Sequence, residues 1–172
     1  MTDSPTLDQI RAKLKEVKHI SDSVKWVEKP TNSAYLEGVV DLYDEDFNTI
    51  PGLTLICTFK MPVQTENVSY KFFVHWKMGK FNRRIFGLEI YDKDYISHRN
   101  KKKRETVRGP HYHLGCQQYL KSKAVVKEVK LLLNSIEFDK WYGRLAKHAK
   151  INTMVKPEKP FDIDLFGNAI VI

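Results

Sequence analysis

The sequence predicts an α+β domain with an antiparallel, meandering sheet of about five to six strands, an N-terminal helix and C-terminal helices. Apolar residues recur at helical spacing near the N-terminus, β-branched and aromatic residues gather in the middle of the chain, and helical spacing returns after Ser122. The 172 residues are 42% hydrophobic and contain no repeat and no Gly/Ser linker. We therefore expect a single domain over residues 1–172.

The first element is an amphipathic helix that extends to about Lys18. Thr6 followed by Gln9 has the form of a capping box, in which each side chain bonds the backbone of the other residue. Apolar residues then follow at spacings of three and four with charges between them. These apolar residues are Leu7, Ile10, Leu14 and Val17.

Short β-prone runs follow at 24–27, 35–42 and 53–59, and the clearest hairpin joins 70–76 to 81–91 with Met78-Gly79 at its turn. One face of its first arm carries Tyr70, Phe72, Val74 and Trp76. Because some face of the longest hairpin must be buried, we expect this face to be core. The alternative is an exposed platform on which unpaired bases stack.

Two helical segments or one broken helix are expected after Ser122. The residues on the predicted helical face are Val125, Val129, Leu132, Ile136, Phe138, Trp141, Tyr142, Leu145 and Ala149. The segment 157–172 is a possible tail or edge strand, and it is apolar enough to contact another chain instead.

Positive charge is concentrated in one part of the chain. Residues 71–130 hold sixteen Lys and Arg against five acids, whereas the other residues hold thirteen against sixteen. A surface that attracts a polyanion concentrates charge in this way, although a lysine-rich run is often only a solvated loop. The candidate nucleic-acid-binding residues are Lys80, Arg83, Arg84, Lys101, Lys102, Lys103, Arg104 and Arg108.

The sequence contains no apolar stretch of the roughly eighteen residues that a membrane helix needs, and its N-terminus lacks the apolar region of a secretory signal. We therefore expect a soluble, cytoplasmic protein that does not associate with membranes. Cys57 and Cys116 have neither the spacing of a zinc or redox site nor the number needed for a disulfide framework. Both are expected to be reduced thiols.

Three of the six histidines lie within sixteen residues, in His98-Arg99-Asn100 and, after a polar loop, in His111-Tyr112-His113. Residues two apart in a strand project from the same face, so His111 and His113 are expected side by side. His98 and Arg99 come near them if the loop closes as a hairpin.

Two kinds of chemistry suit these residues. In the first, which we favour, His98, His111 and His113 act without a metal as general base and general acid on an RNA 2′-hydroxyl and 5′-oxygen, while Arg99 balances phosphate charge. In the second, the histidines hold a divalent transition metal, with Glu89 or Asp92 as a further ligand.

Metal-free acid–base catalysis is preferred because carboxylates, which usually complete a hydrolytic metal site, are sparse here, and because the nearby cations disfavour binding of a metal ion. A third reading is structural: the pair His111 and His113 lines an edge strand and bonds neighbouring loops.

The segment 86–113, with its IYD strand end, HRN step, polar loop and GPHYH, resembles two groups of small bacterial and phage proteins. One group shares an HRN, loop, GPHxH pattern, and the other comprises the TumE-like toxins of toxin-antitoxin modules. Resemblance to the toxins implies RNA cleavage by a histidine cluster, which corresponds here to His98, His111 and His113. This chain departs from the toxins in its sparser histidines and longer C-terminal tail.

Together these patterns predict a nucleic-acid-directed protein, with a small histidine-dependent endoribonuclease of toxin or phage-defence type as the first expectation. The alternatives are a non-catalytic nucleic-acid-binding protein and a phage-type inhibitor or interaction protein. The expected partners are RNA or another nucleic acid, and an antitoxin or other protein.

Overall fold

The structure of the chain is a computed structural model that describes residues 4–20, 23–60, 68–100, 105–130, 137–152, 154–163 and 169–171. Seven strands form one antiparallel sheet in the order β1-β2-β3-β4-β5-β8-β9. They are β1 (Val27–Glu28), β2 (Tyr35–Tyr43), β3 (Thr49–Lys60), β4 (Ser69–Met78), β5 (Phe81–Ile90), β8 (His111–Leu114) and β9 (Val125–Glu128). The antiparallel meander is confirmed, but the sheet is larger than the predicted five to six strands.

The extra strand is β9, where the sequence pattern had predicted a helix. Val125 pairs with Leu114 and Glu128 pairs with His111. The short strand β8 offers an unpaired edge, and the β-branched pair Val125-Val126 suits a strand as well as a helix face. Sheet pairing therefore overrides the helical spacing at 125–129. Leu132 and Ile136, which completed that predicted face, lie outside the described residues.

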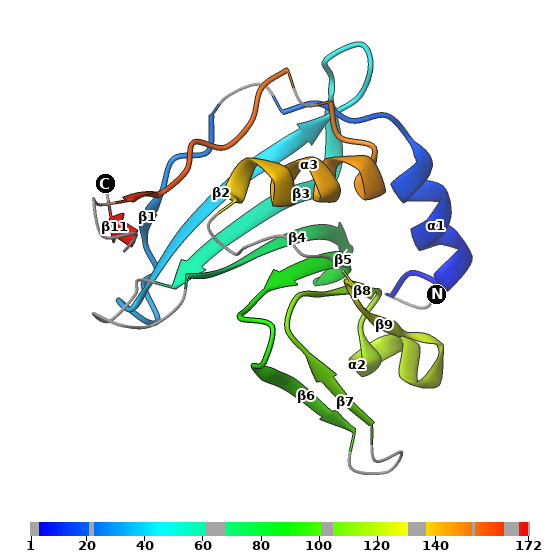
Figure 1. Ribbon diagram of the computed structural model, residues 1–172. Helices are drawn as coiled ribbons and strands as arrows, with labels where there is room; N and C mark the ends of the chain where they lie inside the picture. Colours follow the sequence, from blue (N-terminus) through cyan, green and yellow to red (C-terminus); the bar gives the residue numbers. More distant parts are fainter. Residues whose placement is uncertain are drawn as a thin grey trace.

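Helix α3 (Phe138–Ala149) covers one face of the sheet (Figure 1). Tyr70 and Phe72 of β4 contact it, with ring centroids 5.3 Å apart for Tyr70 and Phe138 and 5.8 Å apart for Phe72 and Tyr142. Tyr70, Phe72 and Val74 are buried, which confirms the predicted core face, whereas Trp76 at its end is half-buried. The α3 helix thereby fixes which sheet face is core and leaves the other for polar groups.

Helix α1 (Leu7–Lys15) begins with the predicted capping box, in which Gln9 N donates to Thr6 Oγ1 and Thr6 N donates to Gln9 Oε1. The helix ends three residues before Lys18, because the backbone at Lys18 leaves helical geometry to pair with Ile151. The Lys18 side chain is buried, and its Nζ donates to the carbonyls of Glu16 and Ala149. This lysine thus links the end of α1 to the end of α3.

Two small sheets lie outside the main one. Strands β6 (Ile96–Asn100) and β7 (Glu105–Arg108) pair with each other, as do β10 (Phe161–Ile163) and β11 (Ala169–Val171). The segment 157–172 therefore contributes a hairpin of its own, and Phe161 is buried with its ring stacked 5.1 Å from that of Phe59. The remaining helices are short, α2 (Gln117–Leu120) and a 3₁₀ turn (Lys121–Lys123).

None of the described helices is long and apolar enough to cross a membrane. Cys57 and Cys116 are both free thiols, as predicted.

Candidate functional site

The structure brings His111 and His113 together on β8, on the sheet face opposite α3. Glu89 pairs with His111 and with Lys71, whereas Tyr112 pairs with Leu88 on the core side. The two imidazole centroids lie 4.9 Å apart. Side-chain alternation along a strand thus gives the juxtaposition that the His-Tyr-His pattern predicted.

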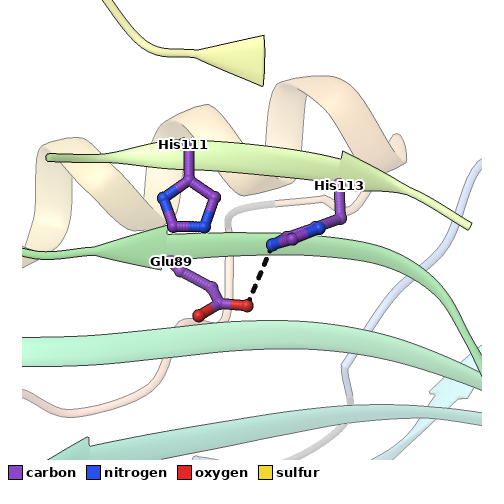
Figure 2. Close-up of side chains that lie close together, drawn as sticks. All are labelled: Glu89, His111 and His113. Atoms are coloured by element: carbon purple, nitrogen blue, oxygen red, sulfur yellow. Dashed lines mark ion pairs between the residues drawn. The ribbon is translucent and has the colours of Figure 1, made fainter. Parts of the chain in front are cut away.

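Glu89 of β5 joins the two histidines to form what we call the Glu/His/His cluster (Figure 2). Its Oε1 lies 3.0 Å from His113 Nε2. His113 pairs with Gly87, which has no side chain, so the imidazole reaches across β5 to the carboxylate. One donor or acceptor atom from each of the three residues lies within 4.8 Å of the others.

Cations and a phenol surround the carboxylate of Glu89. Arg84 Nη1 lies 3.1 Å from Oε1, Lys71 Nζ lies 3.4 Å from Oε2, and the Tyr91 hydroxyl donates to Oε2 at 3.0 Å. Burial alone would raise the pKa of Glu89, but the hydrogen bond from His113 and the positive charge of Lys71 outweigh burial and lower it. Glu89 is therefore held as a carboxylate.

His111 is held from a different side. Its Nδ1 lies 2.9 Å from the carbonyl oxygen of Gly109 and 3.3 Å from Ser97 Oγ. The Tyr91 ring stacks parallel to the imidazole with centroids 5.9 Å apart. Residues 91–97, which lead from β5 to β6, therefore cover this imidazole.

Burial limits what the two histidines can do. His111 is 0% exposed and His113 is 3% exposed. A general acid or base must reach the proton that it transfers, to within hydrogen-bond distance or through one water. Proton transfer to a bulky RNA therefore requires the cover over these imidazoles to open, which at His111 includes residues 91–97. A metal ion also needs a path into the site.

The other predicted catalytic residues lie on the small sheet. His98 pairs with Val107 and Arg99 pairs with Thr106, both from β6 to β7. The side chains of His98 and Arg99 lie outside the described part of the structure. What joins this sheet to the cluster is Ser97, whose hydroxyl donates to the Val107 carbonyl and lies beside His111.

Strands β6 and β7 form an arm, which we call the β6–β7 ribbon (residues 96–100 and 105–108), that projects from the main sheet on the side away from α3 (Figure 1). The sequence pattern predicted a polar loop here. Arg108, at the end of the ribbon, is exposed, and its backbone N–H donates to Glu128. Of the predicted nucleic-acid-binding residues, Lys101, Lys102, Lys103 and Arg104 lie outside the described residues.

The remaining predicted cations lie on the β4–β5 hairpin. Lys80 is exposed at its turn, whereas Arg83 stacks on the rings of Phe81 and Tyr119. Arg84 binds Glu89, so part of its charge is already balanced. Both arginines line a pocket of about 320 Å³, whose other lining residues are Phe73, His75, Asn82, Cys116, Gln118 and Tyr119.

Sequence reasoning missed Lys71, Tyr91 and Ser97 as members of the site. The signal for the first two is period-two spacing: Tyr91 lies two residues after Glu89 and so shares its face, and Lys71 lies on the matching face of the neighbouring strand. Ser97 carries no such signal, because only the path of the chain from β5 to β6 brings it to His111.

Comparison with known proteins adds no assignment. No protein family, curated protein or solved structure gives a significant match to this chain.

Proposed function

We propose that this chain binds nucleic acid, with RNA as the first candidate, through the β6–β7 ribbon. The observation that carries the proposal is a projecting two-stranded arm in the most basic part of the sequence. Residues 96–108 contain six Lys and Arg against one acid. A basic segment of this kind attracts a polyanion, and phosphate neutralisation supplies most of the affinity of non-specific binding.

The shape of the ribbon supports the same proposal. Proteins read duplex DNA with helices or with two-stranded β-ribbons, because both fit the major groove. Single-stranded RNA needs only a cationic track with stacking side chains nearby. Tyr95, which directly precedes β6, is 53% exposed, and its aromatic ring could stack on an unpaired base.

Direct binding of fluorescent oligonucleotides tests the proposal. Anisotropy titrations with single-stranded RNA, double-stranded RNA and duplex DNA would compare the wild type with a variant in which residues 101–104 are serine. We expect at least a tenfold loss of affinity, since four phosphate contacts are removed. A matched control replaces four exposed lysines outside residues 71–130, namely Lys15, Lys25, Lys147 and Lys150, by serine. Equal losses in both variants would show that only net charge matters and would refute a ribbon site.

Endoribonuclease activity is the second candidate. The Glu/His/His cluster favours it, because two imidazoles 4.9 Å apart lie beside a carboxylate and the cations Lys71 and Arg84. Its burial requires opening of residues 91–97 before RNA is reached. Incubation of RNA with the wild type and with His111→Ala and His113→Ala, each with and without a chelator, decides the matter. Cleavage that is unchanged in both variants would remove these histidines from the mechanism.

The structure gives no such support to an interaction role for the C-terminal tail. Phe161 is buried against Phe59, so the apolar side chain at the start of the tail already packs inside this chain and is not available to a partner. A truncation from Phe161 onward is expected to destabilise the fold, which makes it an unsuitable test of partner binding.

A further inference from the structure

We propose that Glu89, His111 and His113 form a binding site for one first-row divalent transition-metal ion. This inference goes beyond nucleic-acid binding by the ribbon and does not depend on it. Two imidazoles and one carboxylate are a common ligand set for such ions, in catalytic zinc sites and in the facial sites of non-haem iron proteins.

The first argument is distance. The Oε1 of Glu89 lies 3.0 Å from Nε2 of His113. Two donors that bind the same ion with bonds of about 2.0–2.2 Å lie about 3.0–3.4 Å apart, so this pair has the spacing of a coordination edge once the ion displaces the proton that Nε2 donates to Oε1. All three ligand atoms lie within 4.8 Å of one another, so the longest separation must shorten by about 1.8 Å at most.

The second argument is the tautomer of His111. Its Nδ1 lies 2.9 Å from the carbonyl oxygen of Gly109, which can only accept a hydrogen bond. The proton is therefore on Nδ1, and the lone pair of the neutral ring is on Nε2. Metal-ligating histidines are usually oriented by this kind of bond, in which the other ring nitrogen donates to a carbonyl or carboxylate.

The third argument is that the carboxylate is also oriented from outside. The Tyr91 hydroxyl donates to Oε2 of Glu89 at 3.0 Å, and the Tyr91 ring stacks on His111. A single residue thus positions two of the three ligands. All three ligands are buried, which excludes bulk water from the site.

Lys71 and Arg84 determine which ions fit. Both contact Glu89 and reduce the negative charge that a cation meets. Calcium and magnesium prefer several oxygen ligands and rely on carboxylate charge, so this site disfavours them. Zinc, cobalt and nickel gain much of their affinity from imidazole nitrogen, and they are the ions that we expect to bind.

Metal content of the purified, tag-free full chain tests the proposal. The protein is stripped with a chelator, incubated separately with Zn²⁺, Co²⁺, Ni²⁺ or Mg²⁺, passed through a desalting column and analysed for metal per chain. We expect about one equivalent of each transition metal and none of Mg²⁺. The visible spectrum of the Co²⁺ form gives a second readout, because its bands report the ligand set.

Two alanine variants and one control localise the site. His111→Ala and His113→Ala are expected to lose the bound equivalent, whereas His19→Ala, whose ring lies against Phe47, keeps it. Tyr91→Phe keeps the ring and removes only the hydroxyl that orients Glu89, so we expect affinity for Zn²⁺ to fall about 10- to 100-fold.

Several results would overturn the proposal. They are a wild type that retains none of the three transition metals, alanine variants that retain a full equivalent, and Tyr91→Phe affinity equal to that of the wild type. If the alanine variants fail to fold, wild-type stoichiometry and the Tyr91→Phe affinity still decide the question. The serine variant of residues 101–104 should bind metal normally, so a failed ribbon proposal is distinguishable from a failed metal site.

Discussion

Replacing Glu89 by Gln in metal-free protein removes one negative charge at the Glu/His/His cluster and preserves side-chain size. In the structure Glu89 is 5% exposed, and its carboxylate lies within 3.4 Å of charged nitrogens of Lys71 and Arg84, with His113 Nε2 at 3.0 Å. The substitution leaves these nitrogens without their counter-ion. We therefore expect the folded state to lose stability.

The size of the expected loss of stability follows from the burial of this ion pair. Removing one partner of a buried ion pair costs about 3–5 kcal/mol, because the remaining charge stays desolvated. The side chains of Lys71 and Arg84 keep 29% and 22% of their exposure, so they regain part of their hydration in the variant. The lower end of the range applies, about 3 kcal/mol. For a chain of this size, that corresponds to a fall in Tm of about 6–12 °C.

Circular dichroism during heating and during urea titration measures both quantities, in the presence of a chelator. The control is Glu45→Gln, an exposed glutamate between β2 and β3, for which we expect a change within about 0.5 kcal/mol. If Glu89→Gln unfolds like the control, the cluster does not stabilise the fold and the electrostatic reasoning is wrong. If the variant is more stable than the wild type, the cluster is a strained site whose burial is retained for a function.

Three further predictions use other parts of the chain. Burial lowers the pKa of Lys18 to about 8, so between this value and the unfolded value near 10.4 the folded state binds fewer protons. The contribution of Lys18 to the free energy of unfolding, measured as the difference between the wild type and Lys18→Met, should then rise by about 3 kcal/mol as pH increases from 7.5 to 10.5. A pH-independent difference in urea titrations would contradict this. For RNA binding, six ribbon cations predict a slope of log K against log salt of about −4 on single strands, and serine at 101–104 should bring it near −1.4 in anisotropy titrations between 50 and 200 mM KCl. An unchanged slope would place the phosphate contacts elsewhere. Finally, Thr6→Ala should cost about 1 kcal/mol in thermal unfolding because α1 loses its cap, whereas no loss would mean that the α1 end is frayed.

The proposals on the ribbon and on the Glu/His/His cluster meet at Ser97. This residue is in β6, yet its hydroxyl lies 3.3 Å from the ring of His111. An RNA bound to the ribbon would therefore lie close to the segment that covers the cluster. Measuring RNA affinity with and without Zn²⁺ shows whether the two sites are coupled, since any coupling must be reciprocal.

Local patterns were reliable where the interaction that they encode is local. The capping box at Thr6 and Gln9 forms between residues three apart, and the burial of Ile10 and Leu14 follows from helical spacing alone, whereas Val17, beyond the end of the helix, is exposed. The side-by-side placement of His111 and His113 depends only on the alternation of a strand. The core face of β4 follows in the same way.

Patterns failed where two structures share the same local spacing. Val125 and Val129 fit one face of a helix, but Val125-Val126 equally suits a strand, and the open edge of β8 decides in favour of the strand. The basic segment 96–108 looked like a loop because it is polar and contains the lysine-rich run 101–104. Pairing of β6 with β7 forms the ribbon nevertheless.

By itself, then, the sequence determined the helix cap, the alternation that pairs the two imidazoles, and the segment in which positive charge accumulates. Only the tertiary structure decided that Glu89 joins the histidines, that the Tyr91 ring and Ser97 contact His111, and that the cluster is buried. The physical reason is the sequence distance over which each interaction acts. Caps and alternation are fixed by covalent geometry over a few residues, whereas strand register and burial depend on which distant segments pack together.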